Sequence, residues 1–312
     1  MGAVPITGVS VVIPVYNSSE TLDLLISRLK PVLDECGGDY ELVLVDDASR
    51  DNSWAKIQQL GQVHKWIRGI RLMRNYGQHN ALLCGIRAAQ KPVIVTMDDD
   101  LQNPPEEIPK LLDRLGEDAD VVYGVREKER HSPYRNIASQ LTKWLLQKSM
   151  GGHVAQNISP FRAFRTVLRE GFSSFKSPYI NIDVLLTWSS TRFQSVVVKH
   201  QSRQAGVSNY NFRKLIVHAL NMITGFSILP LRFASWLGIL FTFFGFLMLA
   251  YVIQQYIVLG VVAQGFTFLA SSIAIFSGAQ LLALGIMGEY LARIHFRLMD
   301  QPSYTVRESV NE

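Results

Sequence analysis

Cysteine is scarce in this chain of 312 residues, which contains two, Cys36 and Cys84. Both fall in the part that we predict below to be cytoplasmic, where disulfides rarely persist, so we expect no disulfide framework. We also expect no secretory signal peptide. The first apolar run, Val9–Val15, is short and has neither a basic segment before it nor a cleavage site after it.

Two common phosphate-binding motifs are missing as well. No G-x-G-x-x-G follows the first apolar run, and no G-x-x-x-x-G-K-[ST] occurs in the chain. The first absence removes the main support for a dinucleotide-binding domain. The second does the same for a P-loop nucleotide hydrolase.

Charge is missing from one long stretch, because no Asp, Glu, Lys or Arg lies between Arg232 and Glu289. The stretch is too long for one membrane crossing and suits two of roughly 20 residues each. It is interrupted at 260–265, so we predict a transmembrane hairpin of Phe233–Leu259 and Phe266–Gly288. The alternative is a buried pair of helices in a soluble core, which the length and the lack of charge disfavour.

Basic residues flank the predicted hairpin on both outer sides, whereas its short connecting loop carries no charge. By the positive-inside rule, both chain termini and the domain before the hairpin then lie in the cytoplasm. The sequence therefore predicts an integral protein of the plasma or inner membrane. The flanking residues are Arg213, Lys214, Arg232, Arg293 and Arg297.

Strand-like and helix-like segments alternate over the first hundred residues. Short apolar runs of the β type are separated by segments with helical periodicity, which predicts right-handed βαβ units and a mostly parallel sheet. The fold class is therefore α/β. The predicted strands are Val9–Val15, Glu41–Val45, Ile70–Met73 and Val93–Met97, and the predicted helices begin near Ser19 and Ser53 and include Ala81–Ala89.

A polar cluster follows each of the four predicted strands. Ligands of open α/β sheets bind at the carboxyl ends of the strands. We therefore expect Tyr16, Asp47, Gly77 and Asp98 to line one crevice and to form a nucleotide site. The alternative for each residue alone is an ordinary loop or a helix cap, a role that suits Asp47 and Ser49.

Three carboxylates, Asp98, Asp99 and Asp100, end the fourth predicted strand. They cannot all be buried without a counter-charge. Asp98 and Asp100 point to the same side of an extended backbone, and Gln102 falls on that side too if the extended path continues. Hard oxygen ligands of this kind predict Mg²⁺ or Mn²⁺. The alternative is a solvated acidic turn before Pro104.

Four motifs follow the predicted strands, and they read P-V-Y-N, V-D-D-A-S-R-D, R-N-Y-G-Q-H and D-D-D-L-Q-N-P-P-E-E-I-P. Together they resemble the motifs of family 2 glycosyltransferases with a GT-A fold. Within that family the chain is most similar to polyprenyl-phosphate glycosyltransferases, such as dolichyl-phosphate mannose synthases and bacterial undecaprenyl-phosphate aminoarabinose and glucosyl transferases. The resemblance extends over nearly the whole chain, including G-E-Y-L-A-R-I after the predicted hairpin.

The resemblance implies roles for these residues. The base, ribose and diphosphate of a nucleotide-sugar would be held along the strand ends, and a metal ion would bridge the diphosphate. An arginine fork suits phosphate oxygens, which supports Arg126 as a contact of the donor. The implied nucleotide-sugar site comprises Pro14, Tyr16, Asp47, Gly77, Asp98 and Arg126, and the implied metal site comprises Asp98, Asp100 and Gln102.

The acceptor side is predicted from two basic amphipathic segments and a loop. Residues 133–150 and 211–230 have apolar residues at helical spacing and are expected to lie in the membrane interface; packing against the sheet is the alternative. Arg135 in the first segment is placed for an anionic lipid head group. The segment Arg203–Tyr210 resembles the family's acceptor loop, so the resemblance implies that Arg135, Arg203 and Ser208 contact the lipid phosphate; an ordinary polar loop is the alternative.

The chain departs from the family at three positions. Ser18 and Asn209 stand where the family commonly has Glu and Lys, and Gln156 stands where it often has an aspartate proposed as catalytic base. Two interpretations follow. The acceptor phosphate, with a second pKa of about 6, is largely ionised and needs no base. Alternatively, Asp183 supplies the missing carboxylate. We favour the first.

These observations predict an enzyme with residues 1–210 as the catalytic domain, 231–292 as the hairpin and 293–312 as a cytoplasmic tail. It transfers a sugar, with inversion, from UDP-sugar or GDP-sugar to polyprenyl phosphate at the cytoplasmic membrane face. Asp100, Arg135, Arg203 and, more weakly, Asp183 are the catalytic candidates. Its partners are the donor, the lipid acceptor and the bilayer, with no nucleic acid.

Resemblance alone implies a homo-oligomer, with a tetramer as one form, and makes the tail 302–306 a candidate contact to a neighbouring copy. Two other functions share some of these sequence features. A processive polysaccharide synthase is disfavoured because Q-x-x-R-W is lacking and two spans are predicted. A non-catalytic membrane protein that binds nucleotide-sugar or lipid phosphate is suggested by Gln156.

Overall fold

The computed structural model describes residues 7–116, 118–126, 158–176, 180–201, 228–259 and 265–311. The chain divides into two compact units, residues 1–210 together with 300–312, and residues 211–299. The predicted interface segments, 133–150 and most of 211–230, lie outside the described residues.

The first unit contains an eight-stranded mixed sheet in the order β7-β5-β6-β4-β1-β2-β3-β8. Strands β6 and β8 run antiparallel to their neighbours, and the other pairs are parallel. The prediction of a mostly parallel sheet is confirmed. The strands are β1 Gly8–Val15, β2 Asp39–Asp46, β3 Ile67–Leu72, β4 Val93–Thr96, β5 Val121–Arg126, β6 Arg162–Arg165, β7 Phe193–Val198 and β8 Val306–Val310.

Helices cover both faces of this sheet, and each face has its own apolar core. Helices α1, α2 and α4 pack on one face, and α3, α6 and the 3₁₀ segment η2 pack on the other. Central strands such as β1 are buried throughout because helices cover both faces of the sheet. Their sequences are therefore almost continuously apolar. The helical elements are α1 Leu22–Cys36, α2 Ser53–Val63, α3 Gln78–Ala88, η1 Pro105–Glu107, α4 Ile108–Arg114, η2 Thr166–Phe172 and α6 Ile182–Ser189.

Each strand predicted in the first hundred residues is present, although the third begins at Ile67 rather than Ile70. The three predicted helices are also present as α1, α2 and α3. Helix α1 buries the leucine-rich face that its periodicity indicates. Strands β1, β2 and β4 are adjacent and parallel, so they end at one edge of the sheet. The polar loops that follow these strands therefore lie close together.

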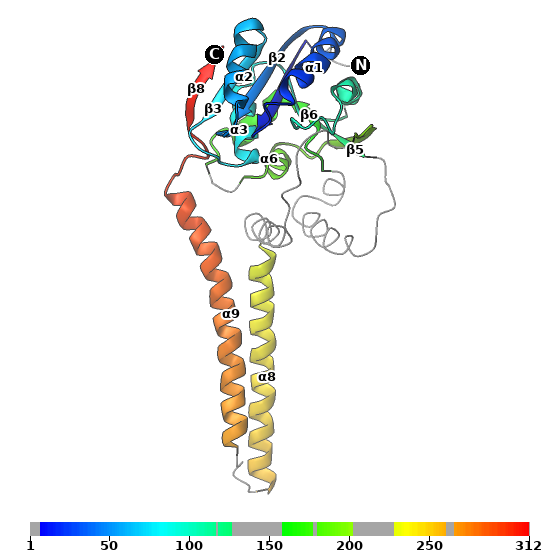
Figure 1. Ribbon diagram of the computed structural model, residues 1–312. Helices are drawn as coiled ribbons and strands as arrows, with labels where there is room; N and C mark the ends of the chain where they lie inside the picture. Colours follow the sequence, from blue (N-terminus) through cyan, green and yellow to red (C-terminus); the bar gives the residue numbers. More distant parts are fainter. Residues whose placement is uncertain are drawn as a thin grey trace. The chain divides into compact units, whose positions relative to one another are not determined.

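The C-terminal tail returns to the first unit and forms the edge strand β8 on β3 of the same chain (Figure 1). Asn311 reinforces this pairing, since its amide donates to the carbonyls of Gly61 and Ile67 at 2.6 and 2.8 Å. Arg71 and Glu308 form an ion pair across the two strands at 3.1 Å. The tail therefore adds an eighth strand to the sheet of its own chain.

The second unit contains two long helices, α8 Leu229–Leu259 and α9 Phe266–Leu298. The rings of Phe241 and Phe276 meet edge to face with centroids 5.6 Å apart. The segments Leu229–Gln255 and Ile275–His295 are long and apolar enough to cross a membrane, with mean hydropathies of 2.2 and 1.3. Neither is buried within the protein, unlike the core helices of a soluble domain. The second segment begins and ends later in the chain than the predicted span.

Candidate active site

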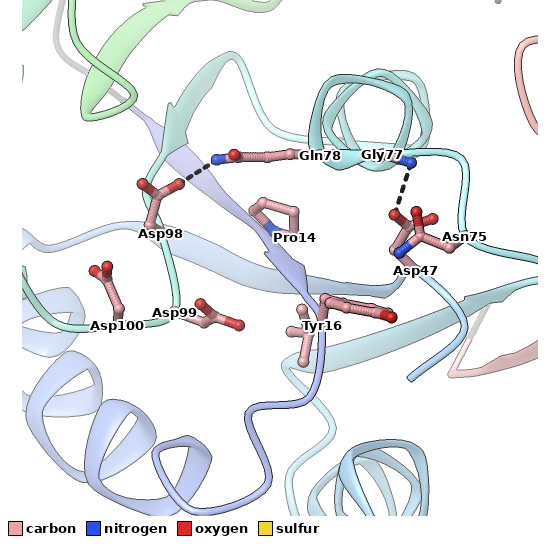
Figure 2. A pocket seen from close by; sticks show the side chains of 10 residues that line it. Pro14, Tyr16, Asp47, Asn75, Gly77, Gln78, Asp98, Asp99 and Asp100 are labelled. Carbon is pink, nitrogen blue, oxygen red and sulfur yellow. Dashed lines mark hydrogen bonds between the residues drawn. The ribbon is translucent and has the colours of Figure 1, made fainter. Parts of the chain in front are cut away.

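A pocket of about 290 Å³ lies where β1, β2 and β4 end, beside the start of α3 (Figure 2). The expectation that polar residues from successive strand ends meet in one crevice therefore holds for Tyr16, Asp47, Gly77 and Asp98. The lining comprises Pro14, Val15, Tyr16, Asp47, Asn75, Gly77, Gln78, Asp98, Asp99 and Asp100.

Asp47 braces one wall of the pocket. Its two carboxylate oxygens accept the backbone N–H groups of Tyr76 and Gly77 at 2.7 and 2.8 Å. Gly77 has a backbone φ of +92°, a conformation that residues other than glycine rarely adopt. Asp47 therefore does not cap the following helix. The turn directly after β2 is stabilised instead by Asp46, whose carboxylate accepts the backbone N–H of Ser49 at 3.0 Å.

Burial raises the pKa of Asp47 above its ordinary value, although the two N–H donors oppose this by favouring the charged form. The carboxylate of Asp46 beside it adds a smaller effect in the upward direction. A buried carboxylate kept at such an energetic disadvantage at the edge of a cleft is typical of functional sites.

The acidic segment is a turn rather than an extended strand. Strand β4 ends at Thr96, and Leu101 has φ of +57°. Asp100 accepts the backbone N–H of Gln102 at 3.1 Å within this turn. The prediction that placed Gln102 by an extended path is therefore wrong in its geometry, and Gln102 is not among the residues that line the pocket.

The three adjacent carboxylates separate into a pair and a single group. Figure 2 shows the side chains of Asp98 and Asp100 on one side of the turn and that of Asp99 directed toward Tyr16. Asp98 accepts a hydrogen bond from the Gln78 amide at 2.6 Å. This role of Gln78 was not predicted from the sequence, although its position directly after Gly77 was an available signal.

Asp99 connects the acidic turn to the end of β1. Burial raises the pKa of Asp99 to about 6, while the Ser18 hydroxyl and the backbone N–H of Tyr16 favour its charged form. Ser18, which stands where the family commonly has Glu, therefore contacts the carboxylate of Asp99. Asp99 consequently helps to fix the pocket wall that contains Tyr16.

Arg126 ends β5 outside the pocket lining, where its guanidinium contacts the ring of His200. Burial lowers the pKa of His200, and the charge of Arg126 lowers it further. Beside this pair, the N–H of Gln201 donates to the carbonyl of Gln102 at 2.9 Å. The segment that ends at Gln201 is thereby attached to the acidic turn.

Asp183 lies in the core rather than in the pocket lining. It is 5% exposed, and its carboxylate contacts Arg162 and accepts the Tyr123 hydroxyl at 2.9 Å. This placement disfavours direct contact of Asp183 with an acceptor. The other acceptor-side candidates, Arg135, Arg203 and Ser208, lie outside the described residues, as does Gln156.

The family model of glycosyl transferase family 2 matches residues 10–172, which include the pocket and its acidic turn. The chain belongs to glycosyl transferase family 2. This glycosyltransferase is also 34% identical over 309 residues to the undecaprenyl-phosphate 4-deoxy-4-formamido-L-arabinose transferase of Pectobacterium carotovorum subsp. carotovorum strain PC1. The match covers 98% of this chain and 94% of that protein.

Solved structures show the same fold. Glucosyl-3-phosphoglycerate synthase from Mycobacterium tuberculosis, in complex with Mn²⁺, UDP and phosphoglyceric acid, matches with a TM-score of 0.52 and 20% identity, over 69% of this chain and 76% of that chain. Its complex with Mn²⁺ and UDP-glucose matches with a TM-score of 0.51 and 19% identity, over the same shares. The GT-A fold of the glycosyltransferase is thus established.

Proposed function

We propose that this glycosyltransferase moves a sugar, with inversion, from a UDP-linked or GDP-linked donor to polyprenyl phosphate. The observation that carries the proposal is the pocket at the strand ends, where Asp98 and Asp100 lie beside Pro14, Tyr16 and Asp47. The relative from Pectobacterium, named for undecaprenyl phosphate and similar over nearly the full length, supports a lipid phosphate as acceptor.

The carboxylate oxygens of the acidic turn suit a divalent cation. Asp98 and Asp100 both line the pocket and offer hard anionic oxygens, which Mg²⁺ and Mn²⁺ prefer. Asp99 is directed elsewhere, and Gln102 stays a weaker candidate ligand because the turn removes it from the lining. When bound, such an ion would act as a Lewis acid on the departing diphosphate.

The residues of the chain bind and orient the two substrates. Pro14, Tyr16 and the Asp47–Gly77 wall hold the nucleoside end of the donor, and Gln78 orients Asp98 through its hydrogen bond. Arg126 lies outside the pocket lining and contacts His200. To bind the donor phosphates, its guanidinium must leave this contact. Positioning and charge therefore carry much of the expected catalysis.

The acceptor phosphate acts as its own nucleophile in this proposal. Its oxygen is largely ionised at neutral pH, since the second pKa of a phosphate monoester is about 6. Asp183 is engaged by Arg162 and Tyr123 in the core, which makes it unsuited to the role of base. Arg135, Arg203 and Ser208 are proposed to bind the lipid phosphate.

The membrane arrangement is also part of the proposal. The two candidate spans form a hairpin, and both termini, the catalytic unit and the tail lie on the cytoplasmic side. The donor is then taken from the cytoplasm and the acceptor from the adjacent leaflet. A homo-oligomer remains an expectation from the family resemblance.

A transfer assay with a metal titration tests this function. The purified full-length chain is given UDP-sugars or GDP-sugars, a short-chain polyprenyl phosphate and increasing Mn²⁺. Asp100→Asn should lower transfer at limiting Mn²⁺ by at least about 100-fold, because a charged ligand is lost. Asp113→Asn, at an exposed position of α4, is the matched control and should stay at the wild-type rate.

Two outcomes would contradict the proposal. Near-wild-type transfer by Asp100→Asn at limiting Mn²⁺ would remove Asp100 from the metal site. Binding of nucleotide and Mn²⁺ by the wild-type chain without turnover of any donor would instead identify a non-catalytic binding protein.

A further inference from the structure

A fully buried arginine lies behind the acidic turn. Arg162 begins β6 and pairs with Thr96 at the end of β4, and its side chain is 1% exposed. The Arg162 Nε donates to the Thr96 hydroxyl at 2.9 Å, and a terminal nitrogen contacts the Asp183 carboxylate. Asp183 is in turn held by the Tyr123 hydroxyl at 2.9 Å.

These side chains share one face of the sheet. Arg162 is the cross-strand partner of both Thr96 on β4 and Tyr123 on β5, and directly paired residues point to the same face. Asp98 lies two residues beyond Thr96, and its charge acts on the Arg162 guanidinium. Gln78 of α3, which packs on this same face, donates to Asp98.

The charge of Arg162 is balanced by two carboxylates of different kinds. Burial disfavours the charged guanidinium, but Asp183, then Tyr123 and, most weakly, Asp98 outweigh that effect and raise the pKa of Arg162. Asp183 is buried in the core, whereas Asp98 lines the pocket. A buried cation stripped of its counter-ion becomes strongly unfavourable and seeks another partner.

We propose that Asp183 is a positioning residue, which retains the charge of Arg162 within the core so that Arg162 does not compete with the metal ion for Asp98. Tyr123 and Thr96 fix the pair from either side. This inference rests on the proposed role of Asp98 as a metal ligand, and it replaces the role of general base for Asp183.

Two variants separate competition between charges from damage to the core. Asp183→Asn leaves the guanidinium charge without its buried partner, so Arg162 is drawn to Asp98 and competes with the metal. The double variant Arg162→Met/Asp183→Leu removes the competing charge together with its partner. It should therefore bind metal better than Asp183→Asn does, although it has lost more polar contacts. Damage to the core alone would give the opposite order.

The test measures Mn²⁺ binding to the full-length protein from the electron paramagnetic resonance signal of free Mn²⁺, with UDP and with GDP present. Asp183→Asn should raise the Kd for Mn²⁺ about tenfold, and the double variant should return it to near the wild-type value. Arg169→Met is the matched control, because it also removes an arginine that forms hydrogen bonds inside the first unit. The partners of Arg169 are backbone carbonyls at the end of α3, not a carboxylate. Its Kd for Mn²⁺ should be unchanged.

Transfer rates complete the test. Saturating Mn²⁺ should restore most of the turnover of Asp183→Asn. An unchanged Kd for Mn²⁺, or a double variant at least as weak as Asp183→Asn, would overturn the inference. So would a loss of about 10²–10⁴-fold in turnover at saturating Mn²⁺, which is expected for a general base. Failure of the proposed metal site is distinguished by Asp100→Asn, which would then bind Mn²⁺ as tightly as the wild-type chain.

Discussion

Glu41 offers a test of what holds the sheet together at the edge opposite the pocket. One carboxylate oxygen accepts the Ser10 hydroxyl at 2.6 Å and the N–H of Gln90 at 2.5 Å. The other accepts from Arg68 at 2.9 Å. Glu41 thus connects β1, β2, β3 and the loop between α3 and β4. Glu41→Gln preserves the shape of the side chain but removes its charge.

The size of the effect follows from the contacts. In Glu41→Gln, the new amide would keep one acceptor oxygen and direct its N–H donors at Arg68, whose side chain is 16% exposed. Loss of one charged hydrogen bond costs about 1.5–3 kcal/mol, and an uncompensated guanidinium adds to this. A loss of about 2–3 kcal/mol lowers the Tm of a domain of this size by roughly 5–10 °C.

The pH dependence has a definite sign. Burial raises the pKa of Glu41, but the bonds from Ser10, Arg68 and Gln90 outweigh it, so the pKa lies below its ordinary value of 4.5. A carboxyl with a lowered pKa in the folded state stabilises the fold above its unfolded pKa. That stability is lost as the pH falls through the folded pKa. The deficit of Glu41→Gln should therefore be constant from about pH 8 to 5.5 and shrink toward about pH 3.

Thermal unfolding of the purified chain in detergent, followed by intrinsic fluorescence across this pH range, measures the deficit. Glu20→Gln, at an exposed position, is the control and should leave Tm unchanged. The affinity for nucleotide should also be unchanged in Glu41→Gln, because the network lies at the amino ends of the strands. An unchanged Tm at neutral pH, or a deficit that grows as the pH falls, would refute the reasoning.

Three further predictions concern other parts of the chain. Arg169→Met should destabilise the first unit by about 1–2 kcal/mol in thermal unfolding, because it removes a cation from the C-terminus of α3; an unchanged Tm would contradict this. Gly77→Ala and Gly37→Ala, both at positive φ, should each cost about 1–3 kcal/mol, but calorimetry should show weaker nucleotide binding for Gly77→Ala alone. A cysteine at Val262 should react with an impermeant thiol reagent added outside cells, whereas one at exposed Arg307 should not; equal labelling would exclude the cytoplasmic tail.

The pocket was predictable from sequence because its residues follow adjacent parallel strands. Apolar runs identified β1, β2 and β4, and the ends of such strands meet at one edge. Tyr16, Asp47 and Asp98 were therefore placed together without any knowledge of distant contacts. Their individual roles were less accessible, since Asp47 braces a turn 29 and 30 residues further along the chain.

The acidic turn shows why the rest was harder. Alternation of side chains holds only while the backbone is extended, and the chain leaves that conformation directly after β4. Leu101 at positive φ carries no signal in sequence, because leucine rarely adopts it. Gln102 was consequently placed by a periodicity that had already ended.

Tertiary contacts explain why two of the strands that were not predicted, β6 and β8, and the role of Arg162 were hard to find. Strand β6, R-A-F-R, lacks the apolar pattern of a buried strand, and its first arginine is buried through a partner that comes later in the chain, Asp183. The edge strand β8, V-R-E-S-V, is charged as edge strands commonly are, which conceals it among polar tails. Neither element follows from local propensity.

The most direct test of the central claim is the choice of acceptor. The purified full-length chain is incubated with Mn²⁺, a panel of UDP-sugars and GDP-sugars, and one of three acceptors: short-chain polyprenyl phosphate, the corresponding polyprenol, or 3-phosphoglycerate. Mass spectrometry then identifies the products. The proposed function predicts a glycosyl polyprenyl phosphate from at least one donor and no product from the other two acceptors. Transfer to polyprenol or 3-phosphoglycerate at a comparable rate, or no product from any donor, would contradict it.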